Sequence, residues 1–380
     1  MGKVTNLNEF REQKKRKKIV RKTIFLVVLF CLTVGGTYIF TSYTPSQLAG
    51  IIGDFFVGDR GKGFPIESPV VNARGLYDQN GSLLVASDSY LYEYNLTGKK
   101  SAQIKHDFIS PAIETDGKFT LLYDRLTNRY NIYKNNEAFK TKKLDNPIFS
   151  ADINKNGEIA VATSSKKYQS VVTVEEREFV WNSSTKIINK VELDNNSNYL
   201  CASGIETSKG QLISTVTLLD TTKTKVVFEV QLPNQIVLDI SFKSGGIEVV
   251  TDQQGLLFSE KGHQIKEFSF ENKPLKFFDF SSDRSLFAYG DFDKQGSIDL
   301  CVLSGNYKVI GNLKLKENIV EAKMTDKFVV ILTNSSVEIF DHSFGHHKTI
   351  IAKDVYKMQP IGNSLYLISK NEISKVQLSL

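Results

Sequence analysis

Residues 110–133 read SPAIETDGKFTLLYDRLTNRYNIY, and the fold prediction starts from this stretch. The dipeptide Asp116-Gly117 is a turn signal, and the run KFTLLYD directly after it is apolar and rich in residues that favour strands. A turn followed by such a run predicts the first hairpin of a β-sheet.

The same motif recurs along the rest of the chain. Comparable runs are SLLVAS, EIAVATS and SLYLIS, and no convincing long amphipathic helix interrupts them after about residue 68. Successive turn signals lie about 36 to 49 residues apart, with a mean near 40. They occur at Asn80-Gly81, Asp116-Gly117, Asn156-Gly157, Asn195-Asn196, Gly245-Gly246, Asp283-Arg284, Thr325-Asp326 and Gly362-Asn363.

A period of about 40 residues with four short strands per unit is typical of β-propeller blades. One blade cannot bury both of its faces, so the units must stack in a ring. We therefore predict an all-β fold, a β-propeller of eight blades over residues 61–380. The blades should begin near residues 69, 110, 147, 190, 235, 274, 318 and 355.

The final unit is short, because residues 355–380 leave room for only three strands. The segment GKGFPIE, Gly61 to Glu67, precedes the first complete blade, and we expect residues near Gly63 to Pro69 to supply the missing strand. Seven blades is the alternative, since the third unit contains the longer stretch VVTVEEREFVWNSSTKI. A pair of β-sandwich domains would also give many short strands, but the regular spacing argues against it.

The N-terminal part has a different composition. Residues 1–23 contain nine basic and two acidic residues and are predicted to be a cytoplasmic tail. Residues 24–43 are uncharged and long enough for a transmembrane helix, and the basic residues before them place the N-terminus inside by the positive-inside rule. The propeller is then extracytoplasmic. A cleaved signal peptide is the alternative, although TSYTPSQLAG offers only a poor cleavage site.

Residues 44–60 are predicted to be a linker that contains a short amphipathic helix. Thr44 as N-cap, Pro45 at the first helical position and Gln47 after it resemble a capping box. Leu48, Ile51, Ile52, Phe55 and Phe56 would then share one side of this helix.

Charge and cysteine content exclude several function classes. The net charge of +6 comes from the tail, because the rest of the chain has 39 basic and 40 acidic residues. A balanced domain lacks the positive charge that drives nucleic-acid binding, so we expect no nucleic-acid partner. Cys201 and Cys301 lie in strand-like runs of different blades and are predicted to be free and buried.

The tail, the membrane segment, GKGFPI, residues 110–133 and NGEIAVATSSKKYQSVVTV, Asn156 to Val174, together resemble a family of bacterial single-pass membrane proteins. Its extracytoplasmic part is a β-propeller of the general WD40-like or quinoprotein-like kind, and its domain has no known function. The resemblance implies a fold and a topology but no chemistry. The chain lacks the Trp-Asp dipeptide of typical WD repeats, and its single tryptophan excludes the blade pattern of quinone-dependent dehydrogenases.

Two segments imitate metal sites. Residues 152–157 read DINKNG, the start of a calcium loop, but Thr163 at the twelfth position cannot supply a bidentate carboxylate. The segment DHSFGHH brings His342, His346 and His347 together near Asp341 as a weak candidate for a metal site. A solvated hairpin loop explains these histidines equally well, so we predict no metal and no cofactor.

No nucleophile elbow and no phosphate-binding loop occurs in the sequence, so no catalytic residue is predicted. The preferred hypothesis is a non-enzymatic binding or scaffolding module at the outer face of the cell membrane, with an envelope protein or a cell-wall component as its partner. The alternative is an extracytoplasmic hydrolase whose site lies at the centre of the propeller, because propeller sites combine residues of different blades without a local motif.

Overall fold

The computed structural model describes Thr33 and residues 63–378, apart from residues 126, 282, 292, 294 and 295 and the side chain of residue 176. No helix among these residues has the length and apolar character that crossing a membrane requires. The predicted tail, membrane segment and linker helix, residues 1–60, lie outside the described residues except for Thr33. Those predictions therefore remain predictions.

Each turn signal found in the sequence connects the first and second strands of one sheet. At the first of them, Asn80 and Gly81 have φ angles of 51° and 87°, which a two-residue hairpin loop requires. The Asp78 side chain accepts a hydrogen bond from Gly81 N at 2.8 Å and closes this turn. Local turn chemistry thus fixes where each hairpin begins.

The strands form eight antiparallel sheets of four strands each. We call these sheets blades 1 to 8 in chain order, and we call their strands A to D from the centre outward. Blade 1 contains β2 (Gly75–Gln79), β3 (Ser82–Ala86), β4 (Tyr90–Tyr94) and β5 (Lys100–Lys105). Blade 2 contains β6 (Pro111–Asp116), β7 (Phe119–Asp124), β8 (Arg129–Lys134) and β9 (Glu137–Lys143).

Blades 3 and 4 include the irregular stretch that suggested a seven-bladed alternative. Blade 3 contains β10 (Ile148–Ile153), β11 (Ile159–Thr163), β12 (Ser170–Val174), the 3-10 turn η1 (Glu175–Arg177) and β13 (Phe179–Ser183). Blade 4 contains β14 (Ile187–Leu193), β15 (Tyr199–Ser208), β16 (Gln211–Asp220) and β17 (Lys225–Pro233). The irregular stretch is therefore the η1 turn between two strands of one blade.

The remaining blades repeat this order. Blade 5 contains β18 (Val237–Lys243), β19 (Gly246–Thr251), β20 (Gln254–Phe258) and β21 (Gln264–Ser269), and blade 6 contains β22 (Leu275–Phe280), β23 (Arg284–Asp291), β24 (Ser297–Ser304) and β25 (Val309–Leu315). Blade 7 contains β26 (Ile319–Met324), β27 (Phe328–Thr333), β28 (Ser336–Asp341) and β29 (His346–Ile351). Blade 8 contains β30 (Val355–Ile361), β31 (Ser364–Ser369), β32 (Glu372–Gln377) and, as its outer strand, β1 (Ile66–Glu67).

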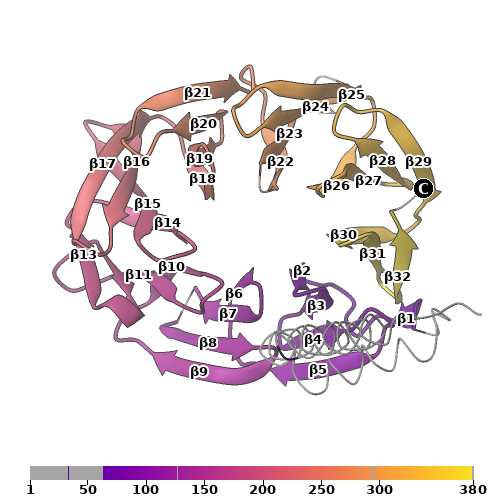
Figure 1. Cartoon of the computed structure of the whole chain (residues 1–380), viewed down its shortest axis with the longest axis horizontal. Helices are drawn as coiled ribbons and strands as arrows, with labels where there is room; N and C mark the ends of the chain where they lie inside the picture. The colour runs from indigo at the N-terminus through magenta and orange to yellow at the C-terminus, as the bar shows by residue number, and fades with distance from the viewer. Residues whose placement is uncertain are drawn as a thin grey trace, which may run out of the picture. The chain divides into compact units, whose positions relative to one another are not determined.

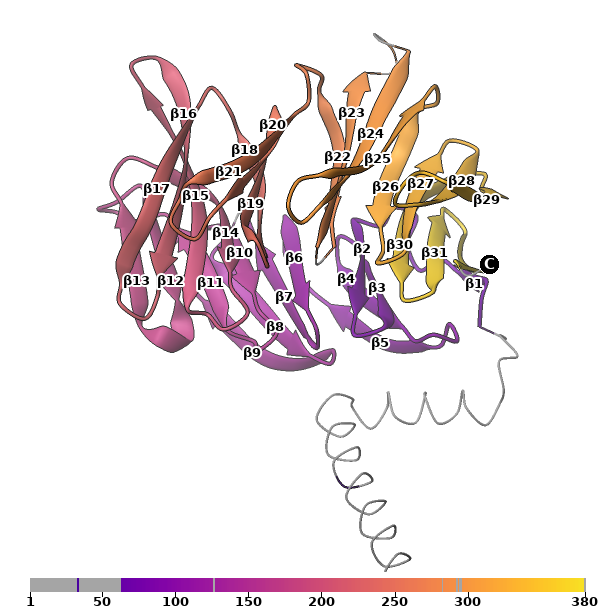
Figure 2. The same cartoon turned by 45° about the horizontal axis from the view of Figure 1, so that its top comes forward.

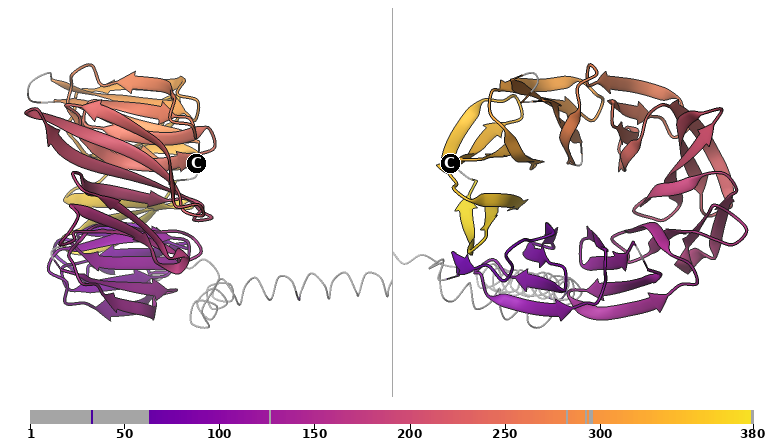
Figure 3. Two further views of the ribbon diagram at one scale, coloured as in Figure 1. Left: turned by 90° about the vertical axis from the view of Figure 1, so that its left-hand side faces the viewer. Right: turned by 180° about the vertical axis from the view of Figure 1, so that it is seen from behind.

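The sheets are arranged in a ring, with strands A innermost (Figure 1). Blade 8 closes it, because Ile66 pairs with Ile373 and Glu67 pairs with Glu372. Seen from behind, the indigo first strand lies beside the yellow last blade (Figure 3). The prediction of eight blades closed by residues near Gly63 to Pro69 is confirmed, and the seven-bladed and β-sandwich alternatives are wrong.

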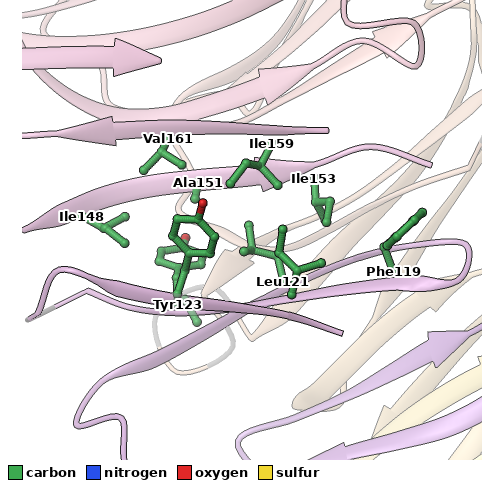
Figure 4. Packing of buried hydrophobic residues seen from close by; sticks show 11 residues of the cluster. Phe119, Leu121, Tyr123, Ile148, Ala151, Ile153, Ile159 and Val161 are labelled. Atoms are coloured by element: carbon green, nitrogen blue, oxygen red, sulfur yellow. The ribbon is translucent and has the colours of Figure 1, made fainter. Parts of the chain in front are cut away.

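Eight apolar clusters fill the ring, and each lies between two neighbouring blades. Figure 4 shows the one between blades 2 and 3, where Leu121 and Tyr123 of β7 pack against Ile148 and Ile159. Gly157 has a φ of 82°, and a Cβ there would lie 2.7 Å from the Phe119 ring. The turn signal at this position therefore also permits close packing between blades.

The two sides of the ring differ. We call the side with the A–B and C–D turns the turn face. Gly63 packs tightly against this face, because a Cβ on it would lie 0.9 Å from the carbonyl oxygen of Thr97 in the C–D turn of blade 1. On the opposite side the long hairpin of β15 and β16 projects beyond its neighbours (Figure 2). The faces thus offer different surfaces to a partner.

Candidate functional site

Eight innermost strands surround the axis of the ring, namely β2, β6, β10, β14, β18, β22, β26 and β30 (Figure 1). In six of them, from β10 to β30, the pairing with strand B shifts register after the first residue, or after the second in β14. Such a bulge redirects the side chains that follow it. Because the shift is the same in all six blades, equivalent residues can be compared by register.

Alternate residues after the shift form two rows of mostly polar or charged side chains, while the residues between them pack into the apolar clusters. The first row consists of Ser150, Lys190, Asp239, Phe277, Glu321 and Lys357. The second row consists of Asp152, Glu192, Ser241, Asp279, Lys323 and Gln359.

Many row residues connect one blade to the next. The carboxylates of Asp152, Asp279 and Glu321 each accept a hydrogen bond at 2.7 Å from a backbone N–H of the following innermost strand, at Leu193, Met324 and Met358. Lys190 of blade 4 forms an ion pair at 2.8 Å with Asp239 of blade 5. The three carboxylates satisfy backbone N–H groups near the axis, and the ion pair joins two blades, so the first role of these side chains is structural.

Acidic side chains of blades 2 to 4 influence one another's charge. Burial, and then the charge of Glu114, raise the pKa of Asp152 to about 7. Burial, and then the charge of Asp152, raise the pKa of Glu192 well above its ordinary value. Although burial lowers the pKa of Lys190, its carboxylate neighbours raise it on balance, Asp239 most of all. The ammonium of Lys190 is thus held charged within this acidic group.

A cavity of about 370 Å³ opens on the turn face between blades 6, 7, 8 and 1. Phe280, Met324, Phe328 and Pro360 form apolar walls. Its polar lining comes from Asp78, Asp279, Lys323, Thr325, Asp326, Lys327, Gln359 and Asn363. None of the acidic side chains of blades 2 to 4 lines it.

Lys323 is the one cation of the second row. It is half-buried, and among the described residues its ammonium group makes neither a hydrogen bond nor an ion pair. By contrast, Lys190 pairs with Asp239, and Lys243, buried between blades 5 and 6, lies 3.6 Å from Glu248. Lys323 therefore brings unused donors to the wall of the cavity.

The segment that imitates a calcium loop has a structural role. Asp152 binds Leu193 N, as described above, and the Asn154 side-chain oxygen accepts hydrogen bonds from the N–H groups of Asn156 and Glu158 at 3.0 and 3.2 Å. Its amide nitrogen donates to Ser197 Oγ of the next blade at 2.6 Å. The polar side chains of this segment hold the A–B turn and join blades 3 and 4.

The structure gives the three histidines of DHSFGHH different partners. His342 Nε2 lies 2.9 Å from the carbonyl oxygen of Thr325, His346 Nε2 lies 3.0 Å from Glu338, and His347 Nε2 lies 3.6 Å from Asp341. Among residues 63–378, where they are described, no three histidine, cysteine or acidic side chains are grouped to hold a metal ion. Cys201 and Cys301 are free and buried, as predicted.

The sequence analysis missed the residues of the cavity. Asp279 lies in KFFDF and Lys323 in VEAKM, so each is a charged residue at the next-to-last position of an otherwise mostly apolar strand. Aligning the blades on their A–B turns would have detected this pattern. Which of these charges borders a cavity depends on packing between blades and is not encoded in any one repeat.

The family comparison agrees with this architecture. A model described as a family of unknown function, DUF5711, matches residues 67–378, which is almost the whole ring. The chain belongs to DUF5711. The resemblance noted in the sequence is therefore confirmed for the propeller, whereas the match begins after the predicted membrane anchor. No curated protein matches the chain.

Solved structures similar to this DUF5711 chain are propellers of diverse origin. The C-terminal WD40 domain of Sif2 has a TM-score of 0.58 and 13% identity, with 83% of this chain and 99% of that domain covered. BamB from Moraxella catarrhalis has a TM-score of 0.54 and 12% identity, with 82% of this chain and 98% of BamB covered. At such identities the likeness shows the fold alone.

Proposed function

We propose that this DUF5711 chain is a membrane-tethered binding module that holds an envelope protein, or a component of the cell wall, on the turn face of an extracytoplasmic propeller. The cavity between blades 6, 7, 8 and 1 is the observation that carries the proposal. It combines apolar walls with polar groups from four blades, which is the composition of a recognition site.

The tether rests on the sequence. A basic tail followed by an uncharged segment of membrane-spanning length predicts one membrane pass with the N-terminus inside. The electrically balanced propeller would then be presented outside the cytoplasm as a rigid ring. A non-enzymatic role fits the row residues, because Asp152 and Glu321 are engaged by backbone N–H groups and lie outside the cavity.

Cysteine labelling in intact cells tests the topology. Cys201 and Cys301 are buried, and burial raises the pKa of the Cys301 thiol to about 12, so neither should react. In a Cys31→Ser background, N196C on an exposed turn should react with a membrane-impermeant maleimide, whereas N6C should react only after permeabilisation. The reverse pattern would reject the arrangement.

Photo-crosslinking tests the binding face. A crosslinking amino acid at Lys327, on the rim of the cavity, should capture a specific envelope component in intact cells. The same amino acid at Lys209, in the exposed hairpin of blade 4 on the other face, is the matched control. Equal capture from both positions, or none from Lys327, contradicts the proposal.

The extracytoplasmic hydrolase is the second candidate, and the acidic group of blades 2 to 4 favours it. A carboxyl whose pKa is near 7, as at Asp152, can act as a general acid at neutral pH. If the chain hydrolyses peptidoglycan fragments, D152N should abolish the reaction. The binding module remains preferred, because Asp152 already binds Leu193 N and does not line the cavity.

A further inference from the structure

The unpaired ammonium of Lys323 limits what the cavity can bind. The charge of Lys323 acts on two carboxylates, Asp279 and Glu321. Burial raises the pKa of both, and the positive charge of Lys323 opposes that rise. Each of these carboxylates accepts a backbone N–H of the next blade at 2.7 Å, and neither forms an ion pair with Lys323 in the described part of the chain. They offset the lysine charge over a distance but leave its three donors unused.

The rest of the lining argues against a bare anion. Asp78, Asp279 and Asp326 border the same cavity, and they would repel an anion that offers no donors in return. Only one oxygen of Asp78 is held by Gly81 N, and the side chain of Gln359 has an oxygen that accepts no hydrogen bond from the described residues. A ligand that fits must therefore present N–H donors as well as an acceptor.

The walls add an apolar requirement. Phe280 and Phe328 are half-buried and Met324 is buried, so the cavity offers apolar surface close to Lys323. A peptide end supplies all three features: a carboxylate, backbone N–H groups beside it and an apolar side chain. Carboxylate capture at a peptide terminus is a general mode of recognition.

We propose that the turn-face cavity binds the free C-terminal carboxylate of a protein segment, with Lys323 as the carboxylate receptor. The apolar walls hold the side chain of the terminal residue, and Asp78 and Gln359 accept backbone N–H groups. This inference rests on the proposed function and specifies the ligand of that same site.

Peptide titration of the full chain in detergent tests the inference. The probes are acetyl-Ala-Ala-Leu with a free carboxylate, the same peptide as its C-terminal amide, and acetyl-Ala-Asp-Ala-Leu-amide, which carries only an internal carboxylate. The free acid should bind at least about 10-fold more tightly than either amide, because only it places a carboxylate beside the apolar terminal side chain. Equal binding of acid and amide, or no binding at about 5 mM, overturns the inference. Preference for the internal carboxylate also overturns it.

The variants assign the effect to one residue. K323Q should remove the preference for the free acid, and K323R should keep most of it. Lys357→Gln is the matched control, because Lys357 is also a half-buried row lysine for which the described residues provide no ion pair, and it does not line the cavity. A preference that survives in K323Q, or is lost equally in K357Q, rejects the role of Lys323.

The two proposals can fail separately. Capture at Lys327 in cells without a carboxylate preference in solution rejects the ligand class and keeps the binding face. A carboxylate preference that depends on Lys323, without capture in cells, keeps the site and rejects its assignment to an envelope partner.

Discussion

At the scale of single residues, the charges between blades have defined partners. Glu248 of β19 accepts hydrogen bonds from Ser285 of blade 6 at 2.5 and 2.7 Å and from Tyr307 OH at 2.8 Å. Lys243 lies 3.6 Å from Glu248, and both side chains are almost fully buried. A buried pair of this kind depends on both members, because each compensates the charge of the other.

We expect E248Q to lower the free energy of unfolding by about 3 to 5 kcal/mol, because it leaves the Lys243 ammonium buried without a carboxylate. The double variant K243M/E248Q removes both charges and should recover most of the loss. Urea unfolding followed through Trp181, the single tryptophan, measures both. A loss under about 1 kcal/mol in E248Q would show that the pair is unimportant.

Asp152 should make stability depend on pH. Its pKa in the folded chain is raised from 3.8 to about 7, so the folded state binds the proton more tightly than the unfolded state. The resulting stabilisation is complete below pH 3.8 and is lost as pH rises through about 7.

D152N should therefore flatten the fall in the urea midpoint between pH 4 and pH 7 while keeping an acceptor for Leu193 N. D145N, at an exposed aspartate, is the control and should retain the slope of the natural chain. An unchanged slope in D152N contradicts the assignment.

At the scale of elements, the shortest strand pairing among the described residues is the one that closes the ring. Strand β1 has two residues, and in register Glu67 faces Glu372, so two like charges lie directly opposite each other. Both side chains are exposed. Directly opposed like charges destabilise an antiparallel pair.

We expect E67K to raise the free energy of unfolding by about 0.2 to 1 kcal/mol, because it replaces this repulsion with an opposite-charge pair. E372K should act in the same direction. The double variant E67K/E372K restores a like-charge pair and should lose the gain, which thermal unfolding can measure. A gain that persists in the double variant would assign it to another cause.

At the scale of the whole molecule, stability depends on an unbroken ring. Every apolar cluster is shared by two blades, so opening the ring between blades 8 and 1 exposes the cluster that contains Phe64, Ile66 and Tyr366. It also leaves the outer edge of β32 without its partner, and such edges promote aggregation.

A chain that begins at Ser68, and so lacks β1, should unfold at lower urea concentration and aggregate, whereas a chain that begins at Gly63 should remain monodisperse. Light scattering and urea unfolding compare the two. Equal behaviour would show that β1 is dispensable for closure.

The sequence predicted the fold well because the information lies in local turns. Asn80-Gly81 and Asn156-Gly157 specify hairpins through backbone conformation alone, and regular spacing then implies the ring. The short last blade predicted the closing strand. The cavity was not predictable in this way, because Asp78, Asp279 and Lys323 are 44 to 245 residues apart in the sequence and meet only through packing between blades.

The closing strand also determines how the domain carries load. A force applied to the chain from its N-terminal side reaches the ring through three residues. Phe64 contacts the Tyr366 ring, and Ile66 and Glu67 pair with β32. The pairing of β1 with β32 is short, so we expect it to separate first under tension. A tethered propeller would then lose the pairing of β1 with β32 before any other blade is disturbed. A partner that binds the turn face tightly and pulls on the domain could therefore open the ring.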